Sequence, residues 1–335
     1  MKERIVKDTF FYSISTFLAK CISVVRSIIV ARFLGPSLYG LWNALSIVLE
    51  YSRYSSLGIS NAMNREVPFY RGKGDNKKAT DIRRIGFSMA VLPSAVVGFV
   101  IILVSLFMYN RVSIEWIAAL RAIAALVLMR QLYDFFQLLL RSDNRFKFLS
   151  TLQLSFAVLD FLLVVGLVIK FHFFGFLWGI VLNYVIIIGV ICYKSFYRYS
   201  LRFYFNKDIF ISLVKIGIFI TLIVVVENLR MTIDRVMIIK FLGIKELGYF
   251  GISYLLIQFI FLIPSSISNI IYPRLVERYG SSNKEEGSLK NYIEVTTQIL
   301  SYSMPILIGM IYILLPTLVN LFLPQYVLGI RAAQI

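Results

Sequence analysis

The chain has 335 residues, of which 59% are hydrophobic and 16% are charged. A soluble domain would have about a quarter charged residues, and a disordered chain would have few apolar ones, so both classes are excluded. The formal charge of +17 is typical of proteins that bind nucleic acid. The apolar runs along the chain exclude that reading and indicate a polytopic membrane protein.

Nine apolar runs are long enough to cross a bilayer, whose core needs about 20 apolar residues per helix. In chain order they are 10–32, 38–62, 85–108, 114–140, 148–169, 173–193, 211–239, 247–272 and 292–323. Longer polar links are expected at 63–84, 141–147, 194–208 and 274–290. Residues 331–335 have the composition of the start of a tenth helix. The sequence therefore predicts an all-α membrane protein with about nine or ten transmembrane helices.

The chain holds few residues of the kinds that catalysis and metal binding require. Its only histidine is His172, and its two cysteines, Cys21 and Cys192, lie in apolar runs. These counts exclude a zinc site with two histidines and disfavour a disulfide framework. We predict no enzymatic activity, no metal site and no cofactor.

The basic residues divide unevenly between the two sets of links. The amino terminus and the four longer links hold 21 Lys and Arg residues, and the opposite set of links holds five. Basic residues are enriched in cytoplasmic loops. We therefore expect a multi-pass protein of the cytoplasmic membrane, with its amino terminus and longer links in the cytoplasm.

Two short motifs recur at one offset of 208 residues. The first motif, Phe33-Leu-Gly35 with Gly40, recurs as Phe241-Leu-Gly243 with Gly248. The second, Ile59-Ser-Asn61, recurs as Ile267-Ser-Asn269. The offset spans six predicted helices, so both copies have the same orientation, as in a parallel repeat. We predict a six-helix lobe over residues 1–200 and a partial second lobe over 201–335, with a cavity between them. The alternative is that two unrelated hairpins share one kind of turn.

Three segments near the amino terminus have a familiar sequence. They are Ala31-Arg-Phe-Leu-Gly-Pro-Ser-Leu-Tyr-Gly-Leu-Trp42, Leu57-Gly-Ile-Ser-Asn-Ala-Met-Asn-Arg-Glu-Val-Pro68 and Tyr70-Arg-Gly-Lys-Gly-Asp75. With Asp234-Arg235, Tyr272-Pro-Arg274 and Leu323-Pro-Gln-Tyr326, they resemble the O-antigen and capsule flippases of polysaccharide synthesis. These flippases belong to the multidrug/oligosaccharidyl-lipid/polysaccharide exporter superfamily.

The resemblance implies a transporter that moves an undecaprenyl-pyrophosphate-linked oligosaccharide across the cytoplasmic membrane by alternating access, for surface polysaccharides such as lipopolysaccharide O-antigen. Its implied partners are the lipid bilayer and the polyprenyl-pyrophosphate-linked glycan, with a polysaccharide polymerase and glycosyltransferases as further candidates and no nucleic acid.

Two alternatives stay open. One is a cation-coupled drug exporter of the same superfamily. The other is a non-transporting scaffold of a polysaccharide assembly complex, because family members carry 12 or 14 helices and this chain is expected to hold one lobe and about half of the next.

Eight basic residues fall at membrane depth: Lys20, Arg26, Arg53, Arg121, Arg130, Lys215, Arg230 and Arg235. Each would cost roughly 2.5–3.5 kcal/mol if it faced lipid at the bilayer centre, so they must pair, snorkel or face water. Helical spacing predicts the pairs Glu50–Arg53 and Arg130–Asp134. Arginine binds pyrophosphate oxygens in a bidentate manner. We predict substrate contacts for Arg26 and Arg53 first, and then for Lys20, Arg121, Arg130 and Arg230.

Acidic residues at membrane depth suggest a second role. Glu227, Arg230 and Asp234 are spaced i, i+3 and i+7, so they share one helix face. They form either a salt-bridge ladder that locks helices together or a cation site that couples H⁺ or Na⁺ entry to transport. Asp160 has no local partner and fits either role. The predicted cation-coupling residues are therefore Glu227, Asp234 and Asp160.

Overall fold

The computed structural model describes residues 2–143, 145–199, 201–280 and 286–334, and this part of the chain is helical. Its elements are α1 (Lys2–Tyr51), η1 (Ser52–Ser56), α2 (Ile59–Gly72), α3 (Asn76–Phe107), α4 (Ile114–Ser142), α5 (Phe146–Tyr199), α6 (Lys207–Phe241), α7 (Ile244–Gly280), α8 (Glu286–Phe322), η2 (Pro324–Gly329) and α9 (Ile330–Gln334). Within the described residues, seven helices are long and apolar enough to cross a membrane. The predicted all-α membrane class is confirmed.

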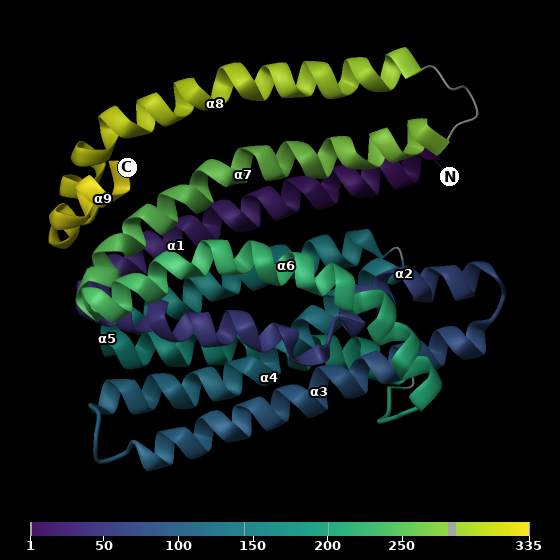
Figure 1. Cartoon of the computed structure of the whole chain (residues 1–335), viewed down its shortest axis with the longest axis horizontal. Helices are drawn as coiled ribbons and strands as arrows, with labels where there is room; N and C mark the ends of the chain where they lie inside the picture. The colour runs from purple at the N-terminus through teal and green to yellow at the C-terminus, as the bar shows by residue number, and fades with distance from the viewer. Residues whose placement is uncertain (1, 144, 200, 281–285, 335) are drawn as a thin grey trace.

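Two of these seven helices fold back on themselves (Figure 1). Helix α1 turns at Gly35, whose φ of 68° is a conformation that glycine adopts at little cost. Helix α5 turns at His172, where φ is 48°, and beyond that turn Gly179 packs directly on Val164. Each of these helices therefore contains two of the predicted spans. The difference between seven helices and nine spans lies in two tight turns where links were expected.

The polar segment 63–84 is mostly helical, so the prediction of a loop there was wrong. Helix α2 buries its apolar face, including Met63, against α3, and this burial extends both helices beyond the apolar runs. The connection is a short turn at Gly74, where φ is 81°. Asp75 caps α3 by accepting a hydrogen bond of 2.9 Å from the backbone N–H of Lys78.

The links fall into two groups at opposite ends of the bundle. In Figure 1, the amino terminus, the α2–α3 turn, the α4–α5 link, residues 201–206 and the facing ends of α7 and α8 lie at one end. The turns within α1 and α5 and the α3–α4 and α6–α7 links lie at the other end. The first group is the basic set identified from the sequence. We call its end of the bundle the basic end.

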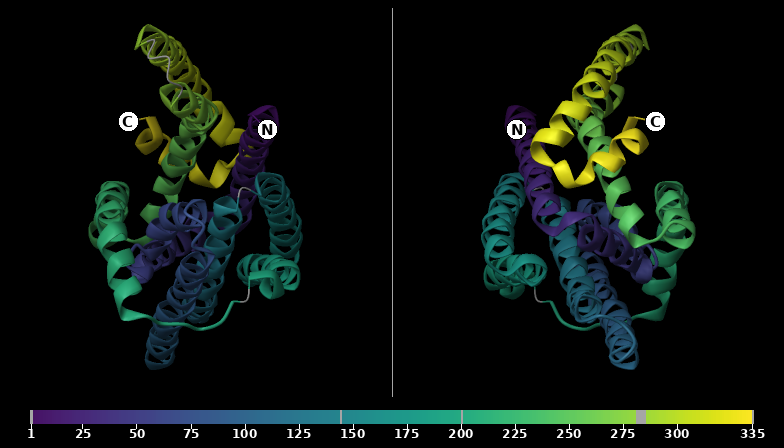
Figure 2. Two further views of the ribbon diagram at one scale, coloured as in Figure 1. Left: turned by 90° about the vertical axis from the view of Figure 1, so that its right-hand side faces the viewer. Right: turned by 90° about the vertical axis from the view of Figure 1, so that its left-hand side faces the viewer.

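End-on views show how the helices surround the middle of the molecule. In Figure 2, α8 lies on the side opposite α3 and α4, with α1 and α7 between them, and α5 and α6 lie on opposite flanks. One apolar cluster, which includes Phe176 and Tyr326, fills the end with the tight turns. A second cluster, around Phe136, packs α2, α3 and α4 towards the basic end.

The 208-residue repeat is visible in the two turns that it predicts. Gly35 and Gly243 both have positive φ, 68° and 102°. Each of them ends one long apolar segment and directs the chain into the next. The side chains of 267–269, which complete the second motif, lie outside the described residues.

The two copies also pack against each other reciprocally. Gly40 lies against the backbone carbonyl of Ile244, and Gly248 lies against the backbone carbonyl of Pro36. Pro36 and Ile244 are themselves 208 residues apart, so each copy presents the same turn to the other. A Cβ at either glycine would overlap the facing backbone. The glycines therefore permit the close backbone approach that small residues give membrane helices.

We predict that Gly40→Ala and Gly248→Ala each lower the free energy of unfolding by about 1–3 kcal/mol, because the added methyl group must displace a carbonyl of the facing turn. The measurement is the midpoint of thermal unfolding in detergent. Gly166→Ala is the matched control, since nothing lies within 4 Å of a Cβ there, and alanine raises helix propensity. If Gly40→Ala were as stable as Gly166→Ala, the proposed close contact would be wrong.

Candidate functional site

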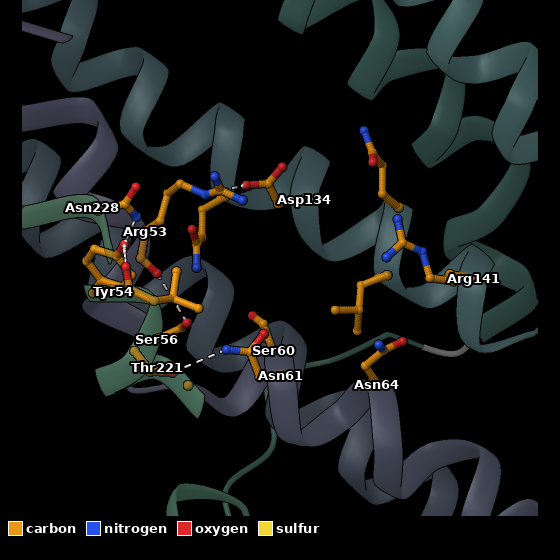
Figure 3. Close-up of a pocket in the computed structure, with 15 residues that line it drawn as sticks. Arg53, Tyr54, Ser56, Ser60, Asn61, Asn64, Asp134, Arg141, Thr221 and Asn228 are labelled. Atoms are coloured by element: carbon orange, nitrogen blue, oxygen red, sulfur yellow. Dashed lines mark hydrogen bonds and ion pairs between the residues drawn. The ribbon is translucent and has the colours of Figure 1, made fainter. Parts of the chain in front are cut away.

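Two adjoining polar cavities lie between α1, η1, α2 and α4 on one side and α6 and α7 on the other. We call the first, of about 310 Å³, the amide cavity (Figure 3). It is lined by Arg53, Tyr54, Ser56, Gly58, Ser60, Asn61, Asn64, Gln131, Asp134, Gln137, Leu138, Arg141, Thr221, Val224 and Asn228. We call the second, of about 320 Å³, the arginine cavity; it is lined by Glu50, Arg53, Arg130, Asn228, Met231, Arg235, Tyr254, Ile257, Gln258 and Phe261. Arg53 and Asn228 line both cavities.

An interruption of the α-helix after Tyr51 positions Arg53. The α-helical part of α1 ends at Tyr51, and the chain continues as the 3₁₀ turn η1. Leu57 and Gly58 then follow in left-handed conformations, with φ of 51° and 78°. Gly58 packs against the backbone of Gly217 on α6, where a Cβ would overlap it. This crossing brings α6 against the break and closes one side of the amide cavity.

One ion pair within a wall and two hydrogen bonds between the walls connect the residues of the amide cavity. The Nε of Arg53 lies 3.1 Å from a carboxylate oxygen of Asp134 on α4. The amide of Asn61 on α2 donates to the hydroxyl of Thr221 on α6, at 3.2 Å. Asn228 on α6 donates to the hydroxyl of Tyr54. Figure 3 shows these pairs bordering the opening.

The arginine cavity has an excess of positive charge. Arg235 on α6 is 3% exposed and donates to Glu50 on α1 at 2.7 Å, and its guanidinium lies 4.7 Å from the ring centre of Tyr254 on α7. Arg130 lines the same cavity, and no ion pair involves it among the described residues. Arg235 is paired with Glu50 and Arg53 with Asp134, so the excess charge of this cavity is the guanidinium of Arg130. An anionic ligand would remove this imbalance, because a buried charge is costly until it is paired.

Arg26 and Asp160 form a separate buried ion pair. Their side chains approach to 3.0 Å between α1 and α5, and each is less than a fifth exposed. Asn183 donates a hydrogen bond of 3.4 Å to the same carboxylate, and Phe176 lies under the guanidinium at 5.4 Å. Neither Arg26 nor Asp160 lines the two polar cavities.

The remaining predicted residues lie outside both cavities. Lys20 is exposed on α1. Arg121 lines a distinct, mainly apolar cavity of about 350 Å³ between α4 and α5. Arg230 forms a 3.4 Å ion pair with Glu227 on the exposed face of α6, and Asp234 is exposed on the same helix. Of the nine predicted site residues, the structure thus brings Arg53 and Arg130 together at the cavities.

Two of the ion pairs predicted from helical spacing, Glu50–Arg53 and Arg130–Asp134, were wrong. Glu50 pairs with Arg235 and Asp134 pairs with Arg53, so both pairs join different helices. Glu227 and Arg230, spaced i, i+3, do form an ion pair, but it lies on the exposed face of α6 and joins no two helices within the described residues.

Arg235 is the arginine of the arginine cavity that the predicted substrate-binding set missed. It follows Asn228 by seven residues, and Asn228 follows Thr221 by seven, so the three share one face of α6. That spacing of polar residues in an apolar helix was the available signal.

Comparison with known proteins identifies the family. A family model described as "Polysaccharide biosynthesis protein" matches residues 29–327. The chain belongs to this family. No curated protein matches the sequence significantly.

Solved structures share the fold. A MOP superfamily transporter from Pyrococcus furiosus, described as having a binding pocket of reverse polarity, is 15% identical with a TM-score of 0.65, and the match covers 98% of this chain and 78% of that one. A multidrug resistance MATE family transporter of the same superfamily, in an outward-facing conformation, is 14% identical with a TM-score of 0.66 and the same coverages. An inward-facing MATE transporter is 14% identical with a TM-score of 0.66, covering 94% and 76%. This family member therefore has the MATE-like fold of a multi-pass membrane transporter.

The Arg26–Asp160 pair gives a testable prediction about stability. Asp160→Ala should lower the free energy of unfolding by about 3–5 kcal/mol, because it leaves the Arg26 charge buried without a partner. The double variant Arg26→Leu/Asp160→Leu should be more stable than Asp160→Ala. Thermal unfolding in detergent measures both effects.

Glu227→Ala serves as the control, since its pair with Arg230 is exposed and exposed pairs contribute little. Equal stability of Asp160→Ala and Glu227→Ala would show that the buried pair is not needed for the fold.

Proposed function

We propose that the protein is a flippase that moves a polyprenyl-pyrophosphate-linked oligosaccharide across the cytoplasmic membrane by alternating access. The family supports a role in polysaccharide biosynthesis, and the fold is that of membrane transporters. The observation that carries the proposal is the placement of Arg53 where the arginine cavity meets the amide cavity.

The chemistry of the arginine cavity supports a pyrophosphate ligand. Arg53, Arg130 and Arg235 converge on it, and Glu50 is the carboxylate among its lining residues. Guanidinium groups bind phosphate oxygens through parallel hydrogen bonds. A polar cavity between the lobes would hold this headgroup while the polyprenyl chain stays in the lipid. A cationic drug would instead meet like charge, so the cavity favours the flippase over the drug exporter.

The orientation belongs to the same proposal. The basic end faces the cytoplasm, as the positive-inside rule requires, and the amide cavity extends from Arg53 towards Arg141 at the basic end of α4. We propose residues 1–200 as the first lobe and 201–335 as the part of the second lobe that α6 to α9 provide. The substrate would then enter from the cytoplasmic side between α4 and α6.

Ion coupling is a further part of the proposal. Asp160 is the candidate coupling residue held in the interior, beside Arg26, whereas Glu227 and Asp234 are exposed on α6. Protonation or Na⁺ binding at Asp160 would weaken its attraction to Arg26, which joins α1 to α5.

Polysaccharide polymerases and glycosyltransferases are proposed partners because they make and consume such lipid-linked glycans.

We predict that Arg53→Ala lowers transport of a fluorescent lipid-pyrophosphate oligosaccharide roughly 10- to 150-fold, the loss expected for a hydrogen bond to a charged group. The measurement is the accessibility of the labelled lipid to an external quencher in proteoliposomes. Arg121→Ala is the matched control, because Arg121 lines a different cavity, and it should transport at the wild-type rate. Wild-type transport by Arg53→Ala, at equal folded content, would remove Arg53 from the site.

A further inference from the structure

The two adjoining cavities differ in chemistry. Five side-chain amides line the amide cavity, together with four hydroxyl groups: Asn61, Asn64, Gln131, Gln137, Asn228, Tyr54, Ser56, Ser60 and Thr221. Its charged residues are Arg53 and Asp134, which pair with each other, and Arg141, which donates to the hydroxyl of Tyr12 at 2.9 Å. The amide cavity therefore carries one net positive charge, on Arg141, and is otherwise lined mainly by groups that both donate and accept hydrogen bonds.

Gln131 is the residue that most directly indicates a ligand. Its side chain is 5% exposed and lines the amide cavity, and it makes no hydrogen bond to another described residue. A buried amide without hydrogen-bond partners destabilises a protein. The partners of Gln131 must therefore come from the cavity, from water or from a bound molecule.

The polar groups are arranged along the cavity and not at one point. On α4, Gln131, Asp134, Leu138 and Arg141 are spaced by three or four residues, so they form one stripe about 15 Å long. In Figure 3, Asn61 and Asn64 of α2 face this stripe across the opening. A ligand in the cavity would meet amides from both sides.

This chemistry suits a neutral polyhydroxylated ring. Each ring hydroxyl both donates and accepts, and a planar amide offers two donors and two acceptor sites. Resting on the function proposed above, we infer that the amide cavity binds the sugar next to the pyrophosphate. Arg53 and Asn228, which line both cavities, then mark the junction between phosphate and sugar. The substrate lies with its phosphates in the arginine cavity and its glycan directed towards the basic end.

The test compares two lipid probes bound to the full chain in nanodiscs: undecaprenyl pyrophosphate, and the same lipid carrying one N-acetylglucosamine. Gln131→Leu and Gln137→Leu keep most of the side-chain volume and remove the amide. Each should raise the Kd for the sugar-bearing lipid about tenfold, as expected for one or two lost hydrogen bonds, and leave the Kd for the bare lipid unchanged. The matched control is Gln298→Leu, an exposed amide on α8 that lines neither cavity.

Thermal stability separates a binding role from a structural one. Gln131→Leu should not lower the unfolding midpoint, because the amide has no partner in the protein to lose. Unchanged Kd values for both lipids in Gln131→Leu and Gln137→Leu would overturn the assignment of the sugar site while leaving the flippase proposal intact, and so would equal losses for both lipids. If the wild-type protein bound neither lipid, the proposed function itself would fail.

Discussion

The close approach of backbones at glycine residues determines where the cavities lie. The second half of α1 is held at two places: Gly40 packs against the start of α7, and Gly58, just after η1, packs against α6. Between these two contacts, the side chains of Glu50 and Arg53 occupy the space that the helices leave open. A Cβ at either glycine would overlap the facing backbone, so larger residues would separate the helices that form the arginine cavity. The position of the charged site thus depends on residues that carry no side chain.

Charge inside the membrane imposes the second constraint. Each carboxylate of the two cavities neutralises an arginine from another helix, Glu50 with Arg235 and Asp134 with Arg53. These pairs connect α1 to α6 and η1 to α4, so they stabilise the arrangement around the cavities. Arg130 remains without an ion pair among the described residues. The positive charge available to a ligand is therefore concentrated at the side of the arginine cavity formed by α4.

The features that depend on the composition of each segment and on the repeated motifs could be predicted from the sequence. Those that depend on contacts between helices could not. The nine spans, the turns at Gly35 and Gly243 and the basic end follow from runs of apolar residues, from glycine and from the distribution of Lys and Arg. The pairing of Asp160 with Arg26 required the two folded helices α1 and α5 to be placed side by side. The sequence does not give the rotation of each helix, and this rotation decides that Arg53 faces the two polar cavities whereas Arg121 and Arg230 do not. The helical extension of α2 was missed because its apolar face lies within a segment that is polar on average.

The two copies of the repeat form similar turns at Gly35 and Gly243, but they contribute differently to the site. In the first copy the helix gives way to η1 at Ser52–Ser56, whereas the equivalent residues 260–264 continue as α-helix in α7. The first copy thus supplies Arg53 and Tyr54 on an open turn, and the second copy supplies Tyr254 and Gln258 from a regular helix. A cleft with identical walls would present the same groups to both ends of a ligand. The two cavities that meet at this interruption have different linings, so the proposed substrate, with its charged pyrophosphate and neutral sugar, would bind them in one orientation.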